Sequence, residues 1–168
     1  MLHTIDNCCS KSYLDSMMLL SQRSDQWNFR YPEGKPFEQR FAKINLVPDN
    51  QNTSLAGMAM GLLLQIYDAG GKDYIVPAMH FCAISVKDKT TPTNFHTDNW
   101  GEGKLKVLGI LNSDWNSKED GGGFICNDVA YKLEPTDFLI FDSNQTHSND
   151  IITSDKDRYA VDFMLTAK

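Results

Sequence analysis

The stretch "DFLIFDSNQTH", residues 137–147, is a short apolar run that ends in polar turn residues and a histidine. An apolar run of this length, bounded by Asp, Ser and Asn, is typical of a buried β-strand followed by a turn. Similar short runs, rich in β-branched and aromatic residues, make up most of the chain after residue 74: residues 74–87, 104–112, 122–128, 129–135 and 158–165. Short strands at regular spacing predict a small barrel or sandwich.

The first third of the chain has a different pattern, and we expect it to form a helical, loop-rich support. Residues 12–22 have apolar side chains at helical spacing, with Ser12 and Asp15 placed as in a capping box. Residues 23–40 are interrupted by prolines and a glycine, which predicts strand fragments joined by loops. Residues 54–71 indicate a second helix that ends at a Gly-Gly pair and packs its apolar stripe against the sheet.

We therefore predict one α+β, mainly β domain over residues 1–168, with supporting helices in about 1–73 and the barrel core in about 74–168. A chain of 168 residues and 19.0 kDa has the size of a single domain. Its 22 acidic and 16 basic residues give a net charge of −6. This balance argues against a nucleic-acid partner, because such proteins need clusters of Lys and Arg to bind phosphates.

The cysteines and the hydropathy pattern indicate a cytoplasmic protein without a membrane partner. Cys8 and Cys9 are adjacent, so their Cα atoms are closer than a disulfide normally allows. Cys82 and Cys126 lie in apolar, strand-like runs, where a free thiol is usually a small core residue. We find neither a secretion leader nor an apolar stretch long enough to span a bilayer.

A possible metal clip lies in "NFHTDNWG", residues 94–101, which we interpret as the end of a strand. Side chains at positions i and i+2 of a strand share one face, so His96 and Asp98 can reach the same point while Thr97 points away. His-x-Asp alone is a weak signal, and a hydrogen-bonded surface pair is the alternative interpretation.

A third ligand strengthens the metal hypothesis, because iron(II) oxygenases bind their metal with two histidines and one carboxylate. We expect His3 to lie at a frayed terminus and His80 to be a packed or hydrogen-bonded core histidine. His147 follows a buried strand and a polar turn, where a sheet can present a side chain to a cavity mouth. It is therefore the best candidate for the third ligand.

Arg158 opens the apolar strand 158–165 and could bind an anion inside the barrel. Its planar guanidinium fits a carboxylate, which makes it a candidate for binding an acidic cofactor. The alternative is a surface ion pair with Asp155 or Asp157.

The order and spacing of five motifs resemble the iron(II)- and 2-oxoglutarate-dependent dioxygenases, specifically the prolyl 4-hydroxylase branch. The motifs are "HTDN" (96–99), "LGILNSDW" (108–115), "EDGGGF" (119–124), "LEPTDFLIFDSNQTH" (133–147) and "RYAV" (158–161). The resemblance implies a double-stranded β-helix, a jelly-roll barrel of two facing sheets like that of the cupins. It also implies that His96, Asp98 and His147 hold Fe(II) and that Arg158 binds the distal carboxylate of 2-oxoglutarate.

The activity implied by the resemblance is hydroxylation of a prolyl residue in a peptide or protein. Dioxygen and 2-oxoglutarate would be co-substrates, succinate and carbon dioxide would be products, and ascorbate is a further reductant that the resemblance allows. Two other functions stay open: hydroxylation of a free amino acid or other small molecule, and non-catalytic binding of a sugar or metal by a jelly roll. The acidic balance disfavours a nucleic-acid demethylase.

The chain departs from the prolyl hydroxylase pattern at several positions. Val86 and Ile110 align where a tyrosine usually contacts the co-substrate, and Met164 replaces an aromatic residue often found after the arginine. Side chains that could substitute for the tyrosine are Tyr67, Tyr74, Tyr131, Lys104 and Lys106.

Four nearby features have structural interpretations. We expect Gly121–Gly123 to form a tight turn or bulge and Trp115 to anchor a turn. Trp100 could flank the cavity mouth. The segment 87–95 is either a surface connection or a loop that covers the substrate.

Overall fold

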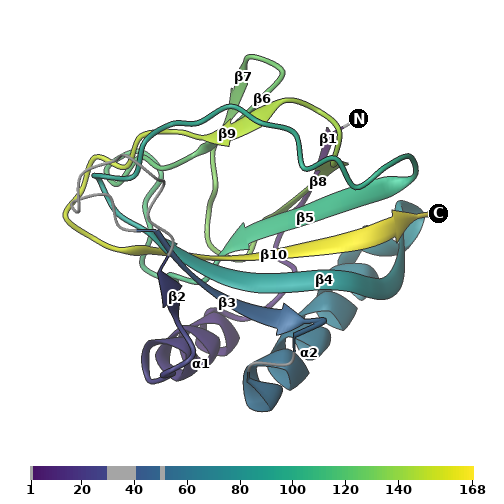
Figure 1. Cartoon of the computed structure of the whole chain (residues 1–168), viewed down its shortest axis with the longest axis horizontal. Coiled ribbons are helices and arrows are strands. Elements are labelled where there is room, and N and C mark those ends of the chain that lie inside the picture. Colours follow the sequence, from purple (N-terminus) through teal and green to yellow (C-terminus); the bar gives the residue numbers. More distant parts are fainter. Residues whose placement is uncertain (1, 30–40, 50–51) are drawn as a thin grey trace.

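The computed structural model describes residues 2–29, 41–49 and 52–168, and its strands form two antiparallel sheets (Figure 1). Within these residues the larger sheet has seven strands in the order β1 (Leu2–Ile5), β8 (Phe138–Asp142), β5 (Lys104–Ile110), β10 (Arg158–Ala167), β4 (Ile75–Lys87), β3 (Phe41–Val47) and β2 (Asn28–Phe29). The smaller sheet has three strands in the order β7 (Val129–Tyr131), β6 (Phe124–Cys126) and β9 (His147–Asn149).

The molecule has three layers, as Figure 1 shows: the smaller sheet, the larger sheet, and the helices α1 (Lys11–Gln22) and α2 (Thr53–Ala69). A short 3₁₀ helix, η1 (Gly71–Asp73), joins α2 to β4. One apolar core lies between the helices and the larger sheet, and a second lies between the two sheets. Two facing sheets with helices outside one of them confirm the predicted mainly β, double-stranded β-helix.

The two-residue period of β10 separates the core from the cavity between the sheets. Val161, Phe163 and Leu165 belong to the core shared with the helices, whereas Arg158 and Asp162 line the cavity. Because successive side chains of a strand point to opposite faces, one strand both stabilises the domain and supplies polar groups to a site.

Both predicted helices are present, but the predicted cap of α1 is wrong. Ser10, not Ser12, caps the helix: its hydroxyl accepts a hydrogen bond from the amide of Tyr13 at 3.2 Å. The sequence pattern placed the cap two residues late because Ser10, Lys11 and Ser12 are all polar, so polarity alone does not show where the helix begins. The second helix ends at Gly70, at a φ of 152°, as expected.

The apolar stripe of α2 packs in the core beside β3 and β4, which confirms the sheet-packing interpretation. Its fully buried members are Leu55, Ala59, Leu62, Leu63 and Ile66. At about 25 cal/mol per Å² of apolar area, burying one leucine contributes roughly 1.5–3 kcal/mol, so this stripe attaches the helix firmly to the sheet.

The first third of the chain supplies more sheet than we predicted. Strands β1 and β3 belong to the larger sheet, where β1 pairs with β8 and β3 pairs with β4. His3 is therefore not at a frayed end: it lies opposite Ile140, and its ring stacks on Tyr74 with centroids 4.0 Å apart. Of the fragments predicted in 23–40, β2 is described, and residues 30–40 lie outside the described residues.

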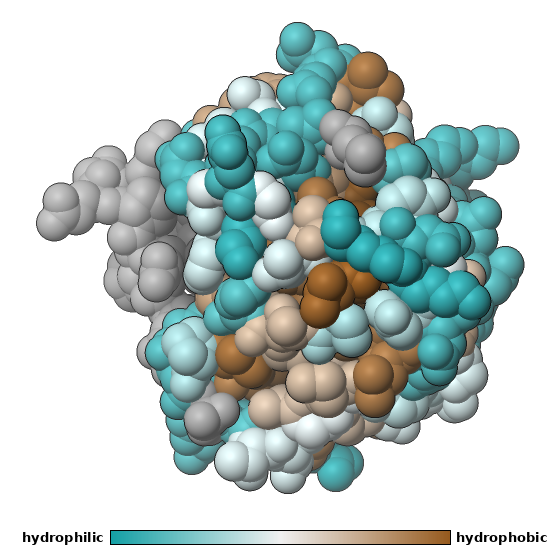
Figure 2. Space-filling view, turned by 90° about the vertical axis from the view of Figure 1, so that its right-hand side faces the viewer, coloured by the Kyte–Doolittle hydropathy of each residue, from teal (hydrophilic) through white to brown (hydrophobic). Residues whose placement is uncertain are grey.

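All four cysteines are free, as expected. Neither α1 nor α2, nor any other helix of the described ranges, is long and apolar enough to cross a membrane. On the face shown in Figure 2, apolar residues reach the surface in a central patch that hydrophilic residues surround.

Candidate metal centre

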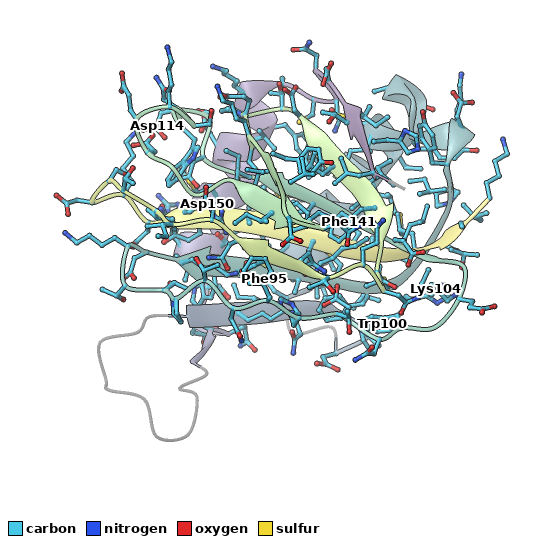
Figure 3. The ribbon with its side chains drawn as sticks, turned by 90° about the horizontal axis from the view of Figure 1, so that it is seen from above. Phe95, Trp100, Lys104, Asp114, Phe141 and Asp150 are labelled. Carbon is cyan, nitrogen blue, oxygen red and sulfur yellow. The ribbon has the colours of Figure 1, made fainter. Side chains whose placement is uncertain are left out.

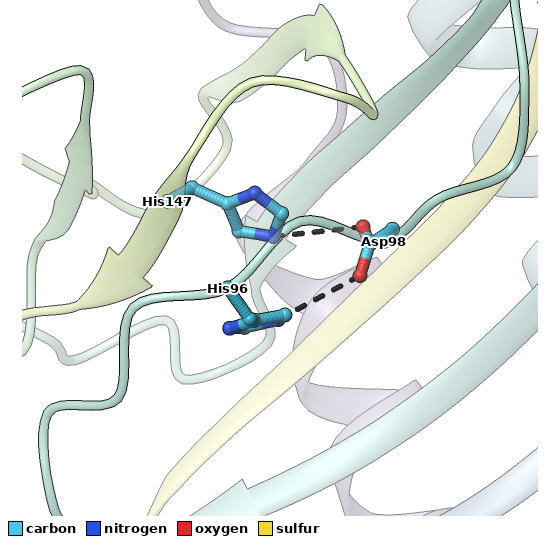
Figure 4. A group of neighbouring side chains, drawn as sticks. All are labelled: His96, Asp98 and His147. Carbon is cyan, nitrogen blue, oxygen red and sulfur yellow. Dashed lines mark ion pairs between the residues drawn. The ribbon is translucent and has the colours of Figure 1, made fainter.

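The structure brings the three predicted ligands together, as Figure 4 shows. One Oδ of Asp98 lies 3.6 Å from Nε2 of His96, and the other lies 3.5 Å from Nε2 of His147. One ligand atom from each residue lies within 4.8 Å of the other two. The side chains of His147 and Asp98 are 3% and 15% exposed, whereas that of His96 is 49% exposed, so the group opens to solvent on the His96 side.

Main-chain hydrogen bonds set the spacing of the two histidines. The His96 amide donates to the His147 carbonyl at 3.0 Å, and the His147 amide donates to the His96 carbonyl at 2.9 Å. The predicted strand end at residues 94–101 is wrong, because only His96 pairs, in this isolated bridge to the start of β9. Asp98 is fixed separately, since its amide donates to the carbonyl of Ser143 at 3.0 Å.

Each imidazole is held in the tautomer that suits a metal ligand. Nδ1 of His96 lies 2.9 Å from the Asn94 carbonyl, and Nδ1 of His147 lies 2.8 Å from the Gln145 carbonyl. A carbonyl only accepts hydrogen bonds, so each Nδ1 carries the proton and each Nε2 presents a lone pair.

The buried Nε2 of His147 makes no hydrogen bond to any residue that the structure describes. Burial, with Lys106 nearby, lowers the pKa of His147 and favours the neutral ring. A buried nitrogen without a partner is costly, and a metal ion would satisfy it. These residues therefore fit a metal of the iron(II) type.

Asp98 is held as a carboxylate by a buried lysine that we considered only as a substitute for a tyrosine. Lys106 donates to Asp98 at 2.9 Å and lies 3.4 Å from Asp162. Burial opposes ionisation of Asp98, but Lys106, His147 and His96 outweigh it and lower the pKa of Asp98. The two carboxylates likewise overcome burial and raise the pKa of Lys106.

The three residues border a cavity of about 190 Å³ between the two sheets. Drug-sized pockets are usually about 300–1,000 Å³, so this cavity suits a small ligand. Apolar walls come from Leu108, Phe124 and Leu133. Arg158 is only 3% exposed and lines the same cavity, which excludes the alternative of a surface ion pair; Asp155 instead pairs with Lys89.

The glycine segment Gly121–Gly123 holds Arg158 in place. Its Nη1 donates to the carbonyl of Gly122 and, at 3.4 Å, to that of Gly123, while its buried Nε makes no hydrogen bond to the described chain. Gly122 has a φ of 65°, and a Cβ there would lie 2.9 Å from Ile152 and 3.1 Å from Trp115, so glycine is required. Burial lowers the pKa of Arg158 to about 10, which still leaves it charged at neutral pH.

The predicted turn or bulge at 121–123 is displaced: the turn lies at residues 117–120, Gly121 pairs with Ile152 in an isolated bridge, and the carbonyls of Gly122 and Gly123 position the arginine. Trp115 anchors the glycine segment: the Trp115 side chain is buried, and its Nε1 donates to the Gly121 carbonyl at 3.1 Å.

Lys87 is a further cation of the cavity, and sequence reasoning missed it. Its Nζ donates to Oδ1 of Asn149 at 2.6 Å. Burial, and then the charges of Arg158 and Lys106, lower the pKa of Lys87 to about 7. Ser85 and Lys87 of β4 line the cavity, whereas Val86 does not. Because β4 pairs with the strand of Arg158, the alternation of side chains along β4 could have indicated that Lys87 faces the cavity.

Most of the proposed substitutes for the tyrosine lie elsewhere. Lys106 lines the cavity, but Tyr67, Tyr74, Tyr131 and Lys104 do not. His80 is exposed rather than in the core, and its Nε2 is within hydrogen-bonding distance of Thr166 and Lys104, at 2.7 and 2.8 Å. Figure 3 shows Phe95 and Trp100 on the segment between β4 and β5 that runs beside the barrel.

No protein-family model matches the sequence, and no curated protein does. Solved structures, however, match nearly the whole chain. A prolyl-4-hydroxylase from Pseudomonas putida has a TM-score of 0.63 and 15% identity, with 99% of this chain and 92% of that chain covered. The fold is that of the iron(II)- and 2-oxoglutarate-dependent oxygenases.

Two other structures with this oxygenase fold cover 98% of the chain. HygX from Streptomyces hygroscopicus, with nickel and 2-oxoglutarate bound, has a TM-score of 0.70 and 15% identity, with 82% of that chain covered. A prolyl hydroxylase from Trichoplax adhaerens, in complex with a peptide fragment of the hypoxia-inducible factor oxygen degradation domain, has a TM-score of 0.61 and 17% identity, with 83% of that chain covered.

Proposed function

We propose that the protein is an iron(II)- and 2-oxoglutarate-dependent dioxygenase that hydroxylates its substrate. One observation carries the proposal: two histidines in the metal-binding tautomer and one carboxylate converge beside a small cavity that contains a buried arginine. HygX, which has the same fold, binds nickel and 2-oxoglutarate, and this supports the assignment of both groups.

Different residues of the chain would bind the metal and the co-substrate. His96, Asp98 and His147 would hold Fe(II), and Arg158, with Lys87 on the same cavity wall, would bind the distal carboxylate of 2-oxoglutarate. When bound, iron and 2-oxoglutarate supply the oxidising power that, with dioxygen, hydroxylates a C–H bond and leaves succinate and carbon dioxide.

Two further contributions come from groups beside the ligands. Lys106 keeps Asp98 ionised and oriented, because it donates to Asp98 at 2.9 Å. The apolar walls Leu108, Phe124 and Leu133 limit the access of water. No acid, base or nucleophile among the side chains is needed for this chemistry.

The first candidate substrate is a prolyl residue in a peptide or protein. The motif resemblance favours it, and two proteins with the same fold are prolyl hydroxylases. The second candidate is a free amino acid, which is favoured by unpaired charges in an adjoining cavity.

Anaerobic addition of Fe(II) and 2-oxoglutarate tests the proposal. We expect the weak visible charge-transfer band of a chelated 2-oxo acid in the native protein and no band in His96→Ala. His80→Ala, which changes a histidine outside the cavity, is the matched control and should keep the band. A colourless native complex would refute the proposal, and succinate formation in air would exclude a non-catalytic binding protein.

A further inference from the structure

A second cavity of about 240 Å³ adjoins the metal centre. It shares Lys43, Asp98, Lys106 and Asp162 with the first cavity. Its remaining walls are Asn45, Phe81, Trp100 and Met164. A ligand in this second cavity would therefore lie beside Asp98 of the metal centre, whereas Arg158 lines only the first of the two cavities.

One carboxylate oxygen in this cavity lacks a donor. Oδ2 of Asp162 faces the ammonium of Lys106 at 3.4 Å, but Oδ1 is buried and accepts no hydrogen bond from the described residues. Lys106 also donates to Asp98 at 2.9 Å, and it interacts with Asp162 only through Oδ2. Asp162 is thus free to accept a hydrogen bond from an ammonium or amide group of a ligand.

The same cavity contains a cation, Lys43, that has no carboxylate partner among the described residues. Lys43 is half-buried, and its Nζ lies 4.4 Å from the ring centroid of Phe81. No carboxylate of the described chain lies within ion-pair distance of it. A cation–π contact leaves the ammonium able to bind an anionic group.

Strand pairing places the two charges on neighbouring parts of one sheet. Lys43 on β3 lies opposite Ser85 on β4, and Asp162 on β10 lies opposite Ala83 on the same β4. Their strands are two spacings, or about 10 Å, apart. Because both side chains line one cavity and the lysine side chain is long, a single small molecule can contact both.

Three of the four remaining walls of the second cavity are apolar. Phe81 and Trp100 contact each other with ring centroids 5.8 Å apart, and Met164 lies beside them in the cavity wall. The replacement of a frequent aromatic residue by Met164 leaves a flexible side chain that adapts to aliphatic groups. These walls suit an apolar side chain that carries the C–H bond to be hydroxylated.

We infer that the second cavity binds a free α-amino acid with an apolar side chain, its ammonium on Asp162 and its carboxylate on Lys43. This inference rests on the proposed function and deepens it by naming the substrate class. A residue inside a peptide has neither charge, so it would leave both Asp162 and Lys43 without partners.

Binding of matched ligands to the anaerobic protein with Fe(II) and 2-oxoglutarate tests the inference. The probes are the free apolar amino acids, including L-proline and L-leucine, each with its N-acetyl, amide and doubly capped forms. Binding is measured from the change in the visible band. We expect at least one free amino acid to bind and each single cap to weaken binding at least tenfold.

Two variants test which charged side chain binds the ammonium of the amino acid and which binds its carboxylate. In Lys43→Met the preference for the free acid over the amide should disappear, while the preference for the free amine over the N-acetyl form stays. In Asp162→Asn the preference for the free amine over the N-acetyl form should disappear, while the preference for the free acid over the amide stays. A merely structural role would weaken all ligands alike, and the controls Lys104→Met and Asp114→Asn, outside both cavities, should keep both preferences.

The outcomes separate this inference from the proposed function. If the visible band forms but no free amino acid binds, or the doubly capped forms bind as tightly, the inference is wrong and the dioxygenase proposal stands. If no band forms in the native protein, the dioxygenase proposal fails, and the inference fails with it.

Discussion

Raising the pH through neutrality should weaken the binding of 2-oxoglutarate because of Lys87. This lysine lines the cavity with Arg158 and has its pKa lowered to about 7, first by burial and then by the charges of Arg158 and Lys106. Other charged groups that act on it are Lys43, which lowers its pKa further, and Asp162, which raises it. Lys87 is therefore mostly charged below pH 7 and mostly neutral above it.

The sign and size of the effect follow from that pKa. The dianion of 2-oxoglutarate prefers the ammonium form, so binding raises the pKa of Lys87 and takes up a proton above pH 7. Affinity should be constant below about pH 7 and then fall by up to about tenfold, or about 1.4 kcal/mol, per pH unit. Between pH 7 and pH 9 the loss should approach, at most, roughly 100-fold.

Calorimetric titration of 2-oxoglutarate into the nickel-loaded protein measures this dependence. In Lys87→Met, binding should be weaker at pH 6, and the fall above pH 7 should disappear. Lys104→Met, a lysine change outside the cavity, should keep the native profile. A flat native profile, or the same slope in Lys87→Met, would show that Lys87 does not contact the co-substrate.

Four further changes test the ligand set, the packing and the cap of α1. His147→Ala should weaken nickel binding by more than about 100-fold in calorimetry, since even the loss of an outer partner costs 10–100-fold; unchanged affinity would remove His147 from the site. Gly109→Ala should lower the free energy of unfolding by about 1–3 kcal/mol, because the new Cβ would lie 2.3 Å from Phe138. Gly57→Ala, a helical position with nothing within 4 Å, should raise it by about 0.5–1 kcal/mol; equal effects in denaturant titrations would contradict this packing. Ser10→Ala should cost about 1 kcal/mol through the lost cap of α1, and a neutral result would restore the cap predicted from sequence.

The barrel strands and the His96–Asp98 pair could be predicted because both depend on local patterns. Alternation along β10 and the short apolar run of β8 identify strands without any knowledge of their partners. The i, i+2 relation of His96 and Asp98 survives although the segment is not a regular strand, because an extended chain alternates in the same way.

The missed elements depend on contacts between distant parts of the chain. Strand β1 has only four residues, and it is a strand because Leu2 and its neighbours pair with β8. No local pattern in so short a segment can indicate that partner. The cap of α1 was also missed, since a choice between nearby serines depends on where the first turn begins.

The polar residues of the cavities were missed for a different reason. Asp162 lies four residues after Arg158, so alternation alone places it on the same face of β10. We interpreted that strand as apolar and did not follow its polar positions. Lys87 needed more, because its lowered pKa comes from burial and from Arg158 and Lys106, which only the fold brings near it.

The reciprocal amide–carbonyl pair between His96 and His147 makes the distance between the two imidazoles a property of the polypeptide backbone. An insertion, deletion or exchange in the intervening loops that preserves this pair, and the separate bond from the Asp98 amide to the Ser143 carbonyl, leaves the spacing of the three side chains unchanged. The cavity walls can therefore change in sequence while the arrangement of His96, Asp98 and His147 stays the same.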